Sequence, residues 1–136
     1  MRITRAQADA IVRHARDEFP NECCGLIAGH GDQATRVLPT RNAEGTPFMY
    51  VMDPLEQMQL MEEIEDAGED LVAIYHSHTR SAAYPSTSDV DLAFFAEPLY
   101  VICSLQDADN PVIRAFRLAR SAPEGEQIAE EPVEIS

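Results

Sequence analysis

The sequence has little positive charge, few cysteines and no long apolar segment. Its 136 residues include 10 Lys and Arg against 24 Asp and Glu, which gives a formal net charge of -14 at pH 7. Clustered basic residues drive binding to nucleic acids and anionic membranes, so their shortage argues against both kinds of partner. No run approaches the ~18 apolar residues that a membrane-spanning helix needs, and the first residues lack a signal-peptide pattern. We therefore expect a cytoplasmic protein that binds neither nucleic acid nor membrane.

Cysteine is scarce, and its placement excludes several kinds of site. The chain has three cysteines, Cys23, Cys24 and Cys103, an odd number of which two are adjacent. A disulfide between adjacent residues would be strained. Without a CxxC spacing, neither a thiolate zinc site nor a thioredoxin-like redox pair is supported. We expect all three to be small, reduced, buried residues on strands.

The composition is that of a folded domain with an acidic end. Hydrophobic residues make up 45% of the chain, and a domain of this length buries roughly two-thirds of the surface that its unfolded chain exposes. Residues 119–136 differ from the rest, because they contain five Glu, one Arg and two Pro and show no sustained periodicity. We predict one domain over residues 1–118 and a mobile acidic tail over 119–136, with at most one short edge strand near its end.

Helices are predicted for three segments, residues 3–19, 53–68 and 86–96. Each begins with a pair of residues that can form a capping box, namely Thr4 with Gln7, Asp53 with Glu56, and Ser86 with Asp89. Apolar residues recur with helical spacing in the first two segments, as Ala8, Ile11, Val12 and Ala15, and as Leu55, Met58, Met61 and Ile64. We expect these stripes to face the core.

Short apolar runs flanked by turn residues predict strands. The runs are residues 23–28, 35–38, 48–52, 71–75, 99–105 and 112–118. The first two would form a hairpin, and the continuous apolar run 71–75 is typical of a strand covered on both faces. Strands interspersed with helices predict an α/β or α+β layered domain in which helices flank a mixed sheet.

The residues after the 71–75 strand carry the chemistry. Side chains in a strand alternate between faces, so His76 and His78 would point to the same side and could share one metal ion. Asp89, in the first turn of the next helix, could supply a third ligand. Two imidazoles and a carboxylate suit zinc better than magnesium, and three protein ligands leave a fourth position open to water.

Each part of this pattern also has a simpler explanation. Two histidines in an HxH spacing are weak evidence of a metal on their own, and Ser86 with Asp89 has the spacing of a helix cap. His14 and His30 are expected to be solvated. The methionines of the central region are expected to line the core or a groove, and they are Met49, Met52, Met58 and Met61.

Taken together, these residues resemble a known signature. His76-x-His78, followed after seven residues by Ser86 and after two more by Asp89, with Glu22 far upstream, resembles the JAMM motif of MPN+ metalloproteases. The segment 21–29 is similar to the Glu-bearing strand of small bacterial members of the Mec type, and the resemblance extends over residues 4–118. It implies a JAMM/MPN domain with cytidine-deaminase-like architecture.

The resemblance also implies a role for each of the five residues. His76, His78 and Asp89 would bind one zinc ion per chain, Glu22 would be the general base, and Ser86 would donate a hydrogen bond to the oxyanion. The implied reaction is hydrolysis of the peptide bond after the Gly-Gly C-terminus of a ubiquitin-like sulfur-carrier protein, which releases cysteine in cysteine biosynthesis.

Other functions are weighed against this one. A JAMM peptidase could instead mature another ubiquitin-like carrier or modifier in the manner of a deubiquitinase. A non-catalytic MPN-like interaction module would have lost some of the five residues, all of which are present here. A zinc nucleotide deaminase would need H-x-E and P-C-x-x-C, which the sequence lacks. The identity of the carrier, the oligomeric state, the role of the tail and any substrate contact of Arg80 or Tyr84 stay open.

Overall fold

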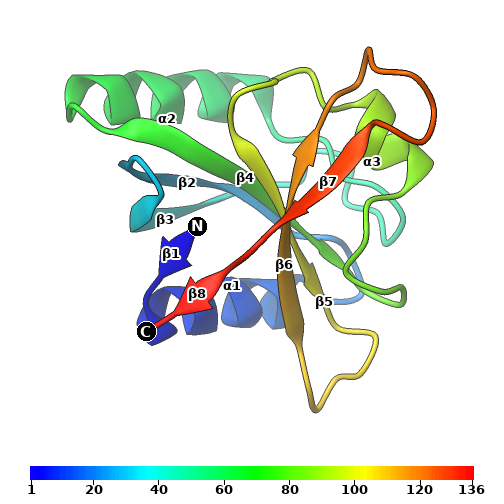
Figure 1. The fold of residues 1–136 in the computed structure, drawn as a ribbon. Coiled ribbons are helices and arrows are strands. Elements are labelled where there is room, and N and C mark those ends of the chain that lie inside the picture. The colour runs from blue at the N-terminus through cyan, green and yellow to red at the C-terminus, as the bar shows by residue number, and fades with distance from the viewer.

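A computed structural model describes all 136 residues as a curled, mixed eight-stranded sheet flanked by helices (Figure 1). The strand order is β7-β6-β5-β4-β2-β3-β1-β8, with parallel pairing between β4 and β5 and of β1 with β3 and β8. The strands are β1 Arg2–Ile3, β2 Cys24–His30, β3 Gln33–Thr40, β4 Asp70–His78, β5 Leu99–Ser104, β6 Val112–Leu118, β7 Ile128–Glu131 and β8 Glu134–Ile135. The helices are α1 Arg5–Glu18, α2 Pro54–Asp66 and α3 Thr87–Asp91. The predicted fold class is confirmed.

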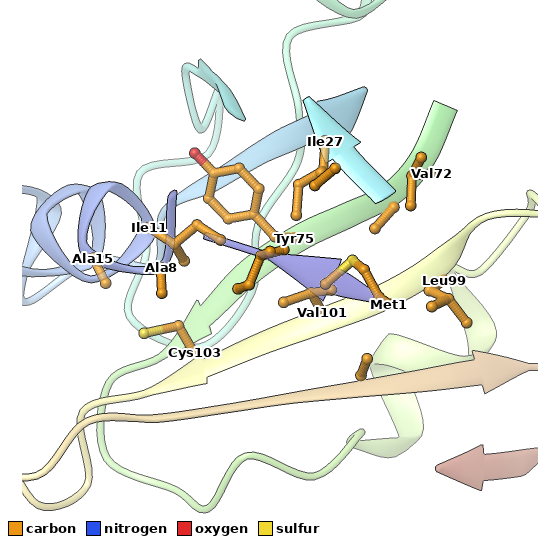
Figure 2. Packing of buried hydrophobic residues seen from close by; sticks show 14 of the residues in the cluster. Met1, Ala8, Ile11, Ala15, Ile27, Val72, Tyr75, Leu99, Val101 and Cys103 are labelled. Carbon is orange, nitrogen blue, oxygen red and sulfur yellow. The ribbon is translucent and has the colours of Figure 1, made fainter. Parts of the chain in front are cut away.

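Both faces of the sheet are covered, so the domain has two hydrophobic cores. One core lies between the sheet and α1 and is centred on Tyr75 of β4, as Figure 2 shows. The other lies under α2 and α3, on the opposite side of the sheet from α1 (Figure 1), and includes Ile74. Because successive residues of β4 point to opposite faces and both faces are buried, this strand is apolar along most of its length.

Local sequence sets the helix starts, although not every expected contact forms. Thr4 and Gln7 make the predicted capping box at the start of α1. At α2, Asp53 accepts hydrogen bonds from two backbone N–H groups, but Glu56 does not close the box. Its carboxylate instead accepts a hydrogen bond from the backbone N–H of Arg41 at 2.6 Å.

Three expected elements differ from the structure. The third helix is five residues long and ends at Asp91 instead of reaching residue 96. Residues 48–52 form no strand, and only Met52 makes an isolated bridge, to Asn42. The apolar stripe of α2 only partly faces the core, because Ile64 is buried whereas Leu55 and Met58 are 59% and 53% exposed.

The predicted mobile tail over residues 119–136 also differs from the structure, because this segment contains two paired strands. β7 pairs with β6, and the guanidinium of Arg114 donates two hydrogen bonds to the carboxylate of Glu130 across this pair. β8 pairs with β1 at the other edge of the sheet. β1, the partner of β8, lies far away in the sequence, so local periodicity could not reveal that pairing. The C-terminal segment therefore joins the two edges of the curled sheet.

All three cysteines are buried and free, as expected, but only Cys24 and Cys103 lie on strands, because β2 begins one residue after Cys23. No helix is both long and apolar enough to cross a membrane.

Candidate metal centre and active site

Two histidines occupy the end of the central strand on its α2/α3 face. His76 pairs in register with Cys24 of β2 and Ile102 of β5, so the backbone on both sides fixes its position. His78 lies two residues further on and points to the same face. Both residues are almost completely buried, with exposed fractions of 1% for His76 and 5% for His78.

Asp89 meets both imidazoles. The Nε2 atoms of His76 and His78 lie 3.2 Å apart. One carboxylate oxygen of Asp89 lies 3.2 Å from Nε2 of His76 and the other lies 2.9 Å from Nε2 of His78. One ligand atom from each residue thus converges on a common point, with all three atoms within 4.8 Å of one another.

The first turn of α3 holds Asp89 in this position. The hydroxyl of Ser86 accepts a hydrogen bond from the backbone N–H of Asp89 at 3.0 Å, and the Asp89 carboxylate accepts one from the N–H of Ser86 at 2.9 Å. Burial acts to raise the pKa of Asp89, but the contacts with His76 and His78 outweigh it and hold the pKa well below its usual range. Asp89 is therefore a carboxylate, the form that binds metal. The capping box predicted from the spacing of Ser86 and Asp89 therefore also positions the Asp89 carboxylate as a metal ligand.

The two histidines are oriented in different ways. Nδ1 of His78 lies 2.8 Å from the carbonyl oxygen of Ala82, so Nδ1–H donates there and Nε2 is the ring nitrogen that faces Asp89. Nδ1 of His76 is buried without a hydrogen-bond partner. Instead, the ring of Tyr50 stacks on the His76 ring, with centroids 4.5 Å apart and planes inclined by 25°. Aromatic packing thus orients the His76 ring, while its Nδ1 stays unpaired.

Glu22 precedes β2 and lies beside this cluster, but it does not belong to the converging group. Its side chain is only 5% exposed, and Oε1 is buried without a hydrogen-bond partner. Burial raises the pKa of Glu22 to about 7, while His78 acts to lower it and Asp89 to raise it. A carboxyl group that titrates near neutrality suits a general base.

The residues present fit a zinc ion. Two imidazole nitrogens and one carboxylate oxygen form a donor set that zinc prefers over magnesium or calcium. Three protein ligands are typical of catalytic zinc, whereas structural sites are closed by four. The unpaired Oε1 of Glu22 adds a buried polar atom with no partner in the chain, as expected for a group that acts on a bound water.

Ser86 lies at the edge of the cluster. Its side chain is exposed, and its hydroxyl accepts the hydrogen bond of the cap but donates to no group in the chain. The hydroxyl proton is therefore free to reach a ligand.

Other sequence expectations have mixed outcomes. His14 is not solvated as predicted, because it is half-buried and its Nδ1 lies 2.7 Å from the hydroxyl of Tyr75. His30 is exposed, as predicted. Arg80 is exposed, and Tyr84 packs edge-on against Phe116.

The sequence interpretation missed Tyr50. This side chain covers His76 and also lines a pocket of about 270 Å³ beside the centre. The other pocket walls are mostly apolar and come from Val51, Met52, Pro54, Gln57, Ile74, Leu92, Phe94, Phe95 and Tyr100. A tyrosine in an apolar segment before a helix has no spacing relationship to the histidines, so no local signal could have found it.

The fold and the site together define a metal-dependent hydrolase of the JAMM class. The mixed sheet lies between helices, and its site combines two histidines on a strand, an aspartate on a helix and a buried glutamate. The model for prokaryotic homologs of the JAB domain matches residues 4–119. The chain belongs to this family, and the predicted resemblance is confirmed.

Known proteins agree with this assignment. A CysO-cysteine peptidase from Mycobacterium tuberculosis is 40% identical over 129 residues, which cover 93% of this chain and 85% of that protein. A probable TtuB-protein conjugate cleaving protease from Thermus thermophilus is 37% identical over 128 residues, with 93% and 79% covered.

Solved structures share the fold. The solution structure of a Desulfitobacterium hafniense protein has a TM-score of 0.87 at 31% identity, covering 99% of this chain and 92% of that chain. A JAB1/MPN domain protein from Archaeoglobus fulgidus has a TM-score of 0.62 at 18% identity, covering 99% and 98%.

Proposed function

We propose that the protein is a zinc-dependent peptidase that removes cysteine from the Gly-Gly C-terminus of a ubiquitin-like sulfur-carrier protein, as a step of cysteine biosynthesis. One observation carries the peptidase chemistry: His76, His78 and Asp89 converge on one point beside a buried, unpaired Glu22 carboxyl group. His76, His78 and Asp89 would hold the metal. When bound, zinc supplies a Lewis acid that makes water a stronger acid and polarises the scissile carbonyl.

The protein's own groups would move the protons and steady the charge. Glu22 would take a proton from the attacking water and then deliver it to the leaving amine, a role that suits a pKa of about 7. Ser86 would donate a hydrogen bond from its free hydroxyl to the oxygen of the scissile carbonyl as negative charge develops there. The capping box places this hydroxyl next to the residue that supplies the carboxylate ligand.

The names of the relatives support the substrate class. One relative is named for cleaving cysteine from the protein CysO and the other for cleaving conjugates of TtuB. An extended Gly-Gly tail is narrow and can pair with a sheet edge or loop through its main chain. The net charge of -14 favours a carrier with a complementary basic face, whose binding would weaken as salt rises.

The test uses ubiquitin-like carriers that end in Gly-Gly-Cys or in a longer extension, incubated with the zinc-loaded protein and analysed by intact mass. Release of cysteine alone supports the proposal, whereas cleavage of only long extensions supports maturation of another ubiquitin-like carrier, and cleavage of protein conjugates supports the activity named for the Thermus relative. Glu22→Ala should keep zinc and lose cleavage. A Glu22→Ala protein as active as the parent would refute the mechanism.

A further inference from the structure

The side chain of Asn42 lies where Glu22 meets the loop that precedes α2. Its Nδ2 donates to the carbonyl oxygen of Glu22 at 3.0 Å and to that of Met49 at 3.3 Å. Its Oδ1 accepts from the backbone N–H of Glu44 at 3.1 Å and of Val51 at 3.0 Å. Both donors and both acceptor positions of this amide are therefore used within the chain.

This loop also holds the backbone of Glu22 on both sides. The N–H of Glu22 donates to the carbonyl oxygen of Thr46 at 2.9 Å, and its carbonyl oxygen accepts from Asn42. The carboxylate oxygen Oε1 has no hydrogen-bond partner of its own. The position of the proposed base is therefore set by its backbone, and the backbone is set by the loop.

The same amide fixes Tyr50. Met49 and Val51, the residues on either side of Tyr50, each make a hydrogen bond with Asn42. The ring between them stacks on His76, whose Nδ1 has no other partner. One side chain thus links the residue beside the metal centre to the ring that covers one of its histidines.

We propose that Asn42 is a positioning residue, which holds the carboxylate of Glu22 and the ring of Tyr50 in register with the metal centre. This inference rests on the proposed function, in which Glu22 is the general base. Only an amide of this length supplies two donors and two acceptors here. An aspartate would place a negative charge against two carbonyl oxygens, and an alanine would leave four backbone groups without this partner.

The test compares Asn42→Ala and Asn42→Asp with the parent at saturating zinc and saturating Gly-Gly-Cys carrier. Both variants should lower kcat by about 10- to 100-fold with KM changed by less than about threefold, because a misplacement of about 1 Å at a reacting group costs rate and not carrier binding. Asn110→Asp is the matched control. It makes the same substitution in an exposed turn and should keep the parent kcat.

Two further measurements separate positioning from a general loss of structure. Amide hydrogen exchange should lose protection at Glu22, Glu44 and Val51 in Asn42→Ala, while α1 and β5 keep theirs. In a Glu22→Asp background, whose base is already displaced, Asn42→Ala should cost less than about threefold in kcat.

The possible outcomes are distinct. Parent-like kcat in Asn42→Ala, or the same fold-loss in both backgrounds, would overturn the role of Asn42 while leaving the peptidase intact. An unimpaired Glu22→Ala protein would instead overturn the proposed function on which the inference rests.

Discussion

The two faces of the sheet differ in how they treat buried polar groups. On the α1 face, the hydroxyl of Tyr75 meets Nδ1 of His14 at 2.7 Å. On the α2/α3 face, Oε1 of Glu22 and Nδ1 of His76 are buried without hydrogen bonds. An unpaired buried polar atom costs about 1–3 kcal/mol of stability. On the α1 face this buried polar pair is hydrogen-bonded, so we call it the scaffold face. The opposite face, the site face, keeps unpaired polar groups that lower the stability of the fold and that catalysis can use.

The largest effect should come from removing a ligand on the site face. Asp89→Ala should lose zinc and all detectable turnover, because the two remaining histidines leave the metal without its anionic ligand. Metal analysis of the purified protein measures this directly. Asp91→Ala is the matched control, since it removes a carboxylate from the same short helix outside the converging group and should keep about one zinc per chain. An Asp89→Ala protein with full zinc would contradict the proposed ligand set.

The next effect distinguishes a catalytic serine from a helix cap. Ser86→Ala should lower turnover by about 10²–10³-fold if the hydroxyl stabilises the oxyanion. If it is only a cap, the variant should lose about 1 kcal/mol of stability with turnover intact. Thr4→Ala is the control on the α1 face, because it removes the capping box of α1. This variant should lose stability and keep the turnover of the parent. Equal turnover in the two variants would remove Ser86 from the mechanism.

A smaller effect should appear as a gain of stability. The pKa of Glu22 is raised from 4.5 to about 7, so between these values the folded state keeps a proton that the unfolded state has lost, and stability falls as pH rises through this window. The full shift corresponds to about 3 kcal/mol, which solvent screening at the site reduces to about 2 kcal/mol. Metal-free Glu22→Gln should thus be more stable than the parent at pH 8 and no more stable at pH 4.

Denaturant unfolding of both proteins at the two pH values measures this difference. A stability gain of the same size at pH 4 and pH 8 would show that ionisation of Glu22 is not its cause.

The smallest effect should come from the scaffold face. Tyr75→Phe removes the hydroxyl that meets His14 and should cost about 1 kcal/mol of stability, measured by thermal unfolding, with turnover unchanged. A large loss of turnover in this variant would mean that the two faces are coupled, and the comparison between scaffold and site would fail.

Sequence reasoning recovered those features that depend on local spacing. The period-two alternation placed His76 and His78 on one face, and the S-x-x-D spacing placed Asp89 in the first turn of α3. Glu22 is far away in the sequence, so only the resemblance to a family could connect it with the histidines. The roles of these residues in catalysis stay predictions.

The remaining features depend on contacts between distant segments. Tyr50 and Asn42 lie in the loop before α2, where the strand predicted over residues 48–52 does not form, and their importance follows only from which residues they contact. The pairing of β8 with β1 was missed for the same reason. For α2 the helical periodicity correctly predicted a helix. The apolar face of this helix, however, is only partly covered by the rest of the chain.

The joining of both sheet edges by the C-terminal segment has a consequence for how the domain folds. The amino group of Met1 donates a hydrogen bond to the carbonyl oxygen of Pro132, a separation of 131 residues, and β1 pairs with β8. β1 therefore completes its edge of the sheet only when β8, which lies far away in the sequence, has paired with it. Because contacts of such long sequence range form slowly, we expect this edge to be among the last parts of the sheet to close during folding.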